Sequence, residues 1–92
     1  MDKIKILMID DNVSLINMVK EYFQSNEEID IVLEAHNGLE GIELIKTQQD
    51  NFDLILLDLV MPVKDGIYVL KEMHKQRLNK KLIVETSYNS PE

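Results

Sequence analysis

The sequence predicts an α/β fold built on a doubly wound parallel sheet. Two short aliphatic runs, at residues 4–9 and 54–57, have the composition of strands buried on both faces. Stretches with apolar residues at every third or fourth position separate these runs from two further strand-like segments. The resulting order, β-α-β-α-β-α-β, is typical of parallel sheets joined by right-handed crossovers.

The first half of this order begins with the strand at 4–9. Asn12 is a suitable N-cap for a first helix, in which apolar residues recur at helical spacing to about Gln24. Residues 29–35 then alternate apolar and polar side chains, a pattern that predicts a half-buried strand at a sheet edge. Asn37-Gly38 is a turn signal before the second helix.

The second helix is short and is expected to end near residues 48–51, before a strand at 53–57. A proline and a glycine interrupt regular structure at 61–66, so this segment is predicted to be a loop. A third helix follows at 67–74. The fourth strand opens at 82–84 and is expected to end near Thr86.

Composition limits the classes of function. The 92 residues allow one domain, residues 1–92, and carry 17 acidic against 10 basic side chains, for a net charge of −7. This balance argues against direct nucleic-acid binding, which needs clustered Lys and Arg. There is no cysteine, no signal peptide and no apolar run near the roughly 20 residues of a membrane span. We therefore expect no membrane association and a location inside the cell.

Three aspartates stand at the ends of the two aliphatic runs. Asp10 and Asp11 follow the first run, and Asp58 follows the second. In an open α/β sheet, ligands bind beyond the carboxyl ends of the strands, so these side chains would share one pocket if the two strands are neighbours. The alternative is that they are solvated strand-end residues, but three such positions favour a functional site.

Such a pocket would favour a hard cation. Neighbouring carboxylates raise each other's pKa unless a cation compensates, and oxygen ligands suit Mg²⁺. Asp58, which stands alone at its strand end, could attack phosphorus as a nucleophile, while Asp10 and Asp11 divide the metal binding. The hydroxyl of Thr86 could bind a phosphoryl oxygen at the same edge, although an ordinary strand-end threonine is an equal alternative.

These residues resemble the receiver domain of bacterial two-component response regulators. The matching motifs are Ile9-Asp10-Asp11-Asn12, then Leu56-Leu57-Asp58-Leu59-Val60-Met61-Pro62-Val63-Lys64-Asp65-Gly66, then Ile83-Val84-Glu85-Thr86-Ser87. The resemblance runs from residue 3 to about residue 88. In detail, the motifs are closest to the sporulation master-regulator branch of the family.

The resemblance implies a flavodoxin-like sheet and a signalling role rather than that of an enzyme. Asp58 would accept a phosphoryl group from a histidine kinase or a phosphorelay protein and so switch an output such as transcription. Mg²⁺ would be held by Asp11, Asp58 and the backbone carbonyl of Val60, with Asp10 assisting, and Thr86 would be the switch hydroxyl. Such a protein would be cytoplasmic.

The chain also departs from the family pattern. The family sheet has the order 2-1-3-4-5, whereas the sequence predicts only 2-1-3-4, a receiver core without the fifth βα unit and without an output domain. That unit carries a phosphoryl-binding Lys, which no position here matches. Glu85 stands where the family usually has an apolar residue.

Two alternative functions remain open. The first is a truncated, non-switching receiver that acts as a protein-interaction module, including a homodimer formed through the exposed fourth strand. The second is a small phosphatase or phosphotransferase outside signalling. The absence of a general acid beside the aspartates disfavours this second alternative.

Overall fold

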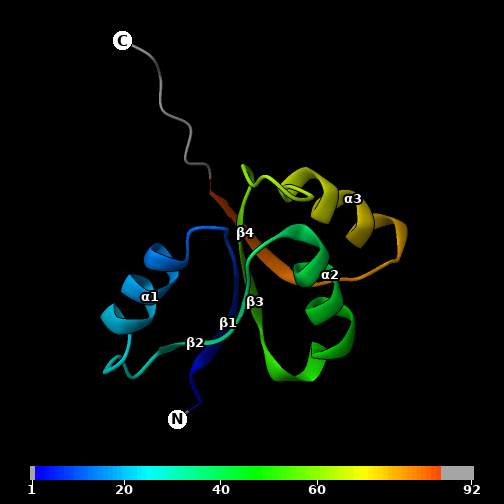
Figure 1. The fold of residues 1–92 in the computed structure, drawn as a ribbon. Helices are drawn as coiled ribbons and strands as arrows, with labels where there is room; N and C mark the ends of the chain where they lie inside the picture. Colours follow the sequence, from blue (N-terminus) through cyan, green and yellow to red (C-terminus); the bar gives the residue numbers. More distant parts are fainter. Residues whose placement is uncertain (1, 86–92) are drawn as a thin grey trace.

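The computed structural model describes residues 2–85, which form a four-stranded parallel sheet (Figure 1). The strands are β1 (Ile4–Ile9), β2 (Ile29–Ala35), β3 (Leu54–Asp58) and β4 (Lys81–Glu85). The sheet order is β2-β1-β3-β4, and each pair of neighbours is parallel, so the predicted order 2-1-3-4 is confirmed. The strands at 29–35 and 4–9 have the predicted bounds, and β2 is an edge strand as expected.

Each α-helix begins at a side-chain cap. The helices are α1 (Val13–Tyr22), α2 (Gly38–Thr47) and α3 (Gly66–Lys75), and a short 3-10 helix, η1 (Gln49–Asn51), follows α2. Asn12, Asn37 and Asp65 each accept a hydrogen bond from the backbone N–H three residues later.

The caps at Asn37 and Asp65 correct two details of the sequence prediction. Gly38 and Gly66 are the first residues of helices, whereas the sequence placed Gly38 in a turn and Gly66 in a loop. Each of these glycines directly follows its cap, where helical geometry begins. The cap at Asn12 is confirmed as predicted.

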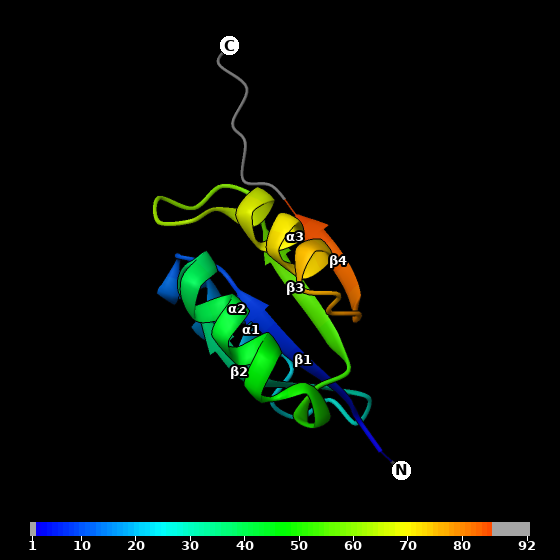
Figure 2. The same ribbon diagram turned by 90° about the vertical axis from the view of Figure 1, so that its right-hand side faces the viewer.

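The helices cover the two faces of the sheet unequally. Figure 2, which turns the molecule by 90°, shows α2 and α3 side by side over one face, and α1 covers the other. The larger core, under α2 and α3, has Ile42, Ile45, Phe52, Val69 and Met73 packed on Leu7, Ile9, Ile55 and Leu57. The smaller core, under α1, joins Ile16 to Ile6, Met8 and Ile31. Strands β1 and β3 contribute to both cores, which explains their nearly continuous aliphatic sequences.

Strand β4 is the second edge of the described sheet, and it is less covered than the others. It pairs with β3, while Ile83 and Val84 expose 53% and 41% of their surface. Within residues 2–85, no helix combines the length and the apolar character needed to cross a membrane.

Candidate functional site

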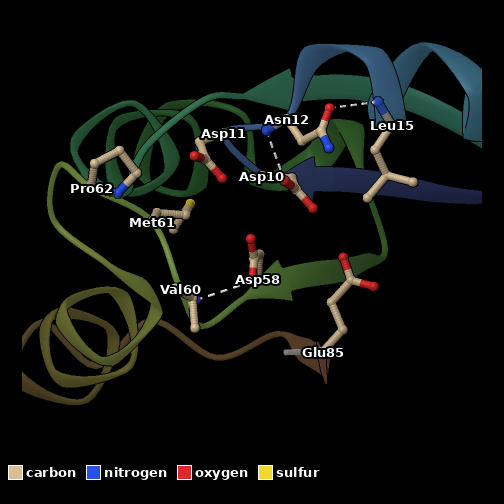
Figure 3. Close-up of a pocket in the computed structure, with 9 residues that line it drawn as sticks. All are labelled: Asp10, Asp11, Asn12, Leu15, Asp58, Val60, Met61, Pro62 and Glu85. Atoms are coloured by element: carbon tan, nitrogen blue, oxygen red, sulfur yellow. Dashed lines mark hydrogen bonds between the residues drawn. The ribbon is translucent and has the colours of Figure 1, made fainter. Parts of the chain in front are cut away.

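A pocket of about 770 Å³ opens at the carboxyl edge of the sheet. Its lining comes from the ends of β3 and β4, from the loops after β1 and β3, and from the first turn of α1 (Figure 3). The nine lining residues are Asp10, Asp11, Asn12, Leu15, Asp58, Val60, Met61, Pro62 and Glu85. The pocket therefore lies where an open parallel sheet usually binds its ligands.

The three aspartates meet in this pocket. Asp10, Asp11 and Asp58 each offer a carboxylate oxygen, and these oxygens lie within 4.8 Å of one another. The reason is topological: β1 and β3 are neighbours, with Ile9 in register with Leu57, so Asp10 directly after β1 and Asp58 at the end of β3 meet at the same edge. Asp10 and Asp58 expose only 2% and 3% of their surface, whereas Asp11 is exposed.

Backbone amides orient the two buried carboxylates. The N–H of Asn12 donates to Asp10 Oδ1 at 2.9 Å, and the N–H of Val60 donates to Asp58 Oδ1 at 3.0 Å. Each bond spans two residues, so each carboxylate is held by the loop that immediately follows it. The Asp58 carboxylate points across the pocket toward Asp10 (Figure 3). The loops thus fix the directions of both acids.

Burial makes the charge of Asp58 costly. It raises the pKa of Asp58 above its ordinary value, and the charges of Asp10 and Asp11 act in the same direction. The Val60 N–H opposes this shift by favouring the ionised carboxylate. A cation would lower this cost, and three clustered carboxylates are a donor set suited to Mg²⁺.

Glu85 adds a fourth carboxylate to the lining of the pocket. It is the register partner of Asp58 on the neighbouring strand, and its carbonyl oxygen accepts a hydrogen bond from Leu59 N–H at 3.0 Å. Burial, followed by the interaction with Asp10, raises the pKa of the Glu85 carboxyl. The sequence marked Glu85 as a departure from the family, but it did not place the side chain in the pocket.

Of the two remaining expected site residues, the structure describes Val60 but not Thr86. Val60 lines the pocket and orients Asp58 through its N–H, while metal binding by its carbonyl stays a prediction. Thr86 lies outside the described residues, so the expected switch hydroxyl also stays a prediction. Met61 and Pro62, which the sequence assigned to a loop, form part of the pocket wall.

Comparison with known proteins identifies relatives along nearly the whole chain. Residues 6–92 match the response regulator receiver domain. A probable C4-dicarboxylate response regulator, DctR of Bacillus subtilis (strain 168), is 36% identical over 88 residues, which are 96% of this chain and 38% of that protein. The chemotaxis protein CheY of Halobacterium salinarum is 33% identical over 96% of this chain and 70% of its own length.

Solved structures are similar as well. The CheX–CheY–BeF₃–Mg²⁺ complex from Borrelia burgdorferi contains a chain that is 28% identical to this one, with a TM-score of 0.79. The similarity covers 94% of this chain and 63% of that one. This chain thus spans under two fifths of the DctR sequence and about two thirds of the solved chain.

Proposed function

Because this chain belongs to the response regulator receiver domain family, we propose that it is a signalling phosphoacceptor in which Asp58 receives the phosphoryl group. The observation that carries the proposal is the meeting of three aspartate carboxylates within 4.8 Å, with Asp58 almost fully buried among them. Such a domain carries out chemistry on itself rather than on a released substrate. It is therefore a switch and not an enzyme in the usual sense.

Mg²⁺ is the cation that this donor set fits. We assign Asp11, Asp58 and the backbone carbonyl of Val60 as its protein ligands, with Asp10 assisting through water. A bound Mg²⁺ would supply positive charge to the phosphoryl oxygens. The exposed position of Asp11 gives the site an open side toward solvent, whereas Asp10 is buried.

Asp58 performs the covalent step. One carboxylate oxygen attacks phosphorus and forms a new P–O bond, while the bond from phosphorus to the donor breaks and its electron pair leaves with the donor. For a phosphohistidine donor, the leaving group is the imidazole nitrogen. The Val60 N–H holds Asp58 Oδ1, which keeps the carboxylate directed across the pocket. The product is an aspartyl phosphate.

Family membership supports a proposal for the partner and the output. We propose that a histidine kinase or a phosphorelay protein in the cytoplasm donates the phosphoryl group, and that the modified domain controls transcription. Thr86 would then turn its hydroxyl toward the phosphoryl oxygens. The motif sequences support the sporulation branch as the narrower assignment. The test compares the rate of phosphoryl transfer to this protein from purified sporulation phosphorelay proteins with the rate from kinases of other pathways. Faster transfer from the phosphorelay proteins would support that assignment.

Intact-mass measurement tests the phosphoacceptor proposal. The protein is incubated with a small acyl-phosphate donor, with Mg²⁺ or with EDTA. We expect a one-phosphoryl adduct that requires Mg²⁺, is absent from Asp58→Asn, and forms much more slowly in Asp11→Asn. Asp30→Asn removes an equal charge from an exposed position on β2 and serves as the control. An equal adduct in Asp58→Asn would refute the assignment of the acceptor.

An interaction module is the second candidate function. The exposed side chains of Ile83 and Val84 on the edge strand β4 favour it, because an uncovered strand edge can pair with another chain. We propose that a homodimer would form through this edge. Sedimentation equilibrium at micromolar concentration tests the proposal: a stable dimer that Ile83→Lys dissociates supports it, and a monomer contradicts it.

A further inference from the structure

Glu85 is directed into the pocket by the register of the sheet. It pairs with Asp58 across the parallel strands β3 and β4, and paired residues on neighbouring strands present their side chains to the same face. Figure 3 shows the Glu85 side chain rising from β4 toward the side of the pocket that holds Asp10. Glu85 is not one of the three acids whose oxygens lie within 4.8 Å of one another.

The pocket gives this carboxylate no described positive partner. None of the nine residues lining the pocket is basic. Glu85 Oε1 is buried and accepts no hydrogen bond from any residue in the range 2–85, and the charged groups that act on the Glu85 carboxylate are the acids Asp10 and Asp58. A buried acceptor without a partner costs free energy, and for an ionised carboxylate the cost is larger. A cation in the pocket would lower this cost without having to contact Glu85 directly.

We propose that Glu85 increases the affinity of the Mg²⁺ site for divalent cations, an inference that rests on the proposed function. Its carboxylate acts as a neighbouring charge, beyond the three aspartates that would hold the ion. Two charges separated by several ångströms in a partly buried pocket still attract appreciably, because the effective dielectric constant there is well below that of water. This chain would therefore bind a divalent cation more tightly than it would with an apolar residue at position 85.

Isothermal titration calorimetry of the full chain with Mg²⁺ measures the effect of Glu85 on the Kd for the cation. Glu85→Gln should raise the Kd for Mg²⁺ by roughly five- to tenfold, the size expected for one nearby charge. Glu85→Asp keeps the charge and should stay within about twofold of the wild type on the same grounds. Glu43→Gln, an equal charge change on the exposed face of α2, is the matched control and should leave the Kd unchanged.

Thermal unfolding provides a readout independent of calorimetry. Because the uncharged amide relieves a buried charge, Glu85→Gln should melt at a higher temperature than the wild type in EDTA. Added Mg²⁺ should raise the melting temperature of Glu85→Gln by less than it raises that of the wild type, because a ligand bound more weakly stabilises the folded state less. Glu85→Met supplies a second neutral variant if the glutamine variant does not fold.

The outcomes separate this inference from the proposed function. If the wild type does not bind Mg²⁺, the metal site itself is wrong and the inference fails with it. If the wild type binds and the neutral variants bind equally well, Glu85 has no role and the phosphoacceptor proposal stands. An equal loss in Glu85→Asp and Glu85→Gln would also overturn the inference, because the charge would then not be the cause.

Discussion

The backbone N–H of Gly38 donates a 2.7 Å hydrogen bond to the carbonyl oxygen of Lys64, which joins the first turn of α2 to the loop after Asp58. The same N–H lies 3.2 Å from the carbonyl oxygen of Val63. Lys64 has a φ of 49°, a left-handed conformation that is uncommon for a residue with a side chain. The start of α2 therefore holds in place the loop that also carries Val60, whose N–H orients Asp58.

Substitution of Gly38 by alanine should loosen this junction. The added Cβ would overlap the Lys64 carbonyl oxygen, so the loop or the helix would have to shift. We expect a loss of about 1–3 kcal/mol in the free energy of unfolding. Gly41→Ala in the same helix is the comparison, because its Cβ would meet side-chain atoms of the buried Ile9, the nearest at 2.8 Å, rather than a backbone carbonyl. Urea denaturation showing Gly38→Ala no less stable than Gly41→Ala would contradict this view.

Lys80, just before β4, forms hydrogen bonds with the segment before β3. Its Nζ donates to the carbonyl oxygens of Gln49 and Phe52 at 2.6 and 2.8 Å, and lies 4.7 Å from the centre of the Phe52 ring. Lys80→Met should therefore lower the free energy of unfolding by about 1–2 kcal/mol. The neighbouring Lys81 is exposed, so Lys81→Met should change stability by less than about 0.5 kcal/mol. Equal losses in the two variants, measured by denaturant unfolding, would show that the Lys80 contacts contribute nothing.

Glu34 should make stability depend on pH. Its two carboxylate oxygens lie 2.9 Å from His36 Nε2 and 2.9 Å from Lys20 Nζ. The hydrogen bond with His36, followed by that with Lys20, lowers the pKa of Glu34 from 4.5. An acid whose pKa is lower in the folded state stabilises the fold above its unfolded pKa, and this contribution is lost as pH falls through the folded value.

The variant Glu34→Gln isolates this contribution. Near neutral pH it should be less stable than the wild type by a modest amount, about 0.2–1 kcal/mol, because the Lys20 and Glu34 side chains are partly exposed to solvent. The difference should shrink as the pH is lowered below 4.5. Urea unfolding of both proteins across this range is the measurement. A difference that stays constant with pH would rule out the ion pairs as its source.

The sheet and the acidic cluster could be predicted because both follow from short-range patterns. Each strand is marked by its own aliphatic run, and the parallel order brings Asp10 and Asp58 to one edge. The starts of α2 and α3 were missed, because Gly38 and Gly66 also satisfy turn patterns and only the caps at Asn37 and Asp65 distinguish the two cases.

Contacts between distant segments could not be predicted in the same way. Lys80 reaches back to Phe52, 28 residues earlier, and no local pattern marks that contact. Glu85 was visible as an unusual acid at the end of a strand. Its position in the pocket depends on the register between β3 and β4, which pairs it with Asp58. The sequence predicts which segments form strands, but it does not determine the register between them.

Locating the phosphoryl group on Asp58 is the most direct test of the proposed function. After incubation with Mg²⁺ and an acyl-phosphate donor, borohydride reduces an aspartyl phosphate to homoserine, which peptide mass spectrometry then locates in the chain. We predict homoserine at position 58 when Mg²⁺ is present, and none when EDTA replaces it. Homoserine at Asp10 or Asp11 in place of Asp58, or no reduction product with the fold intact, would contradict Asp58 as the phosphoacceptor.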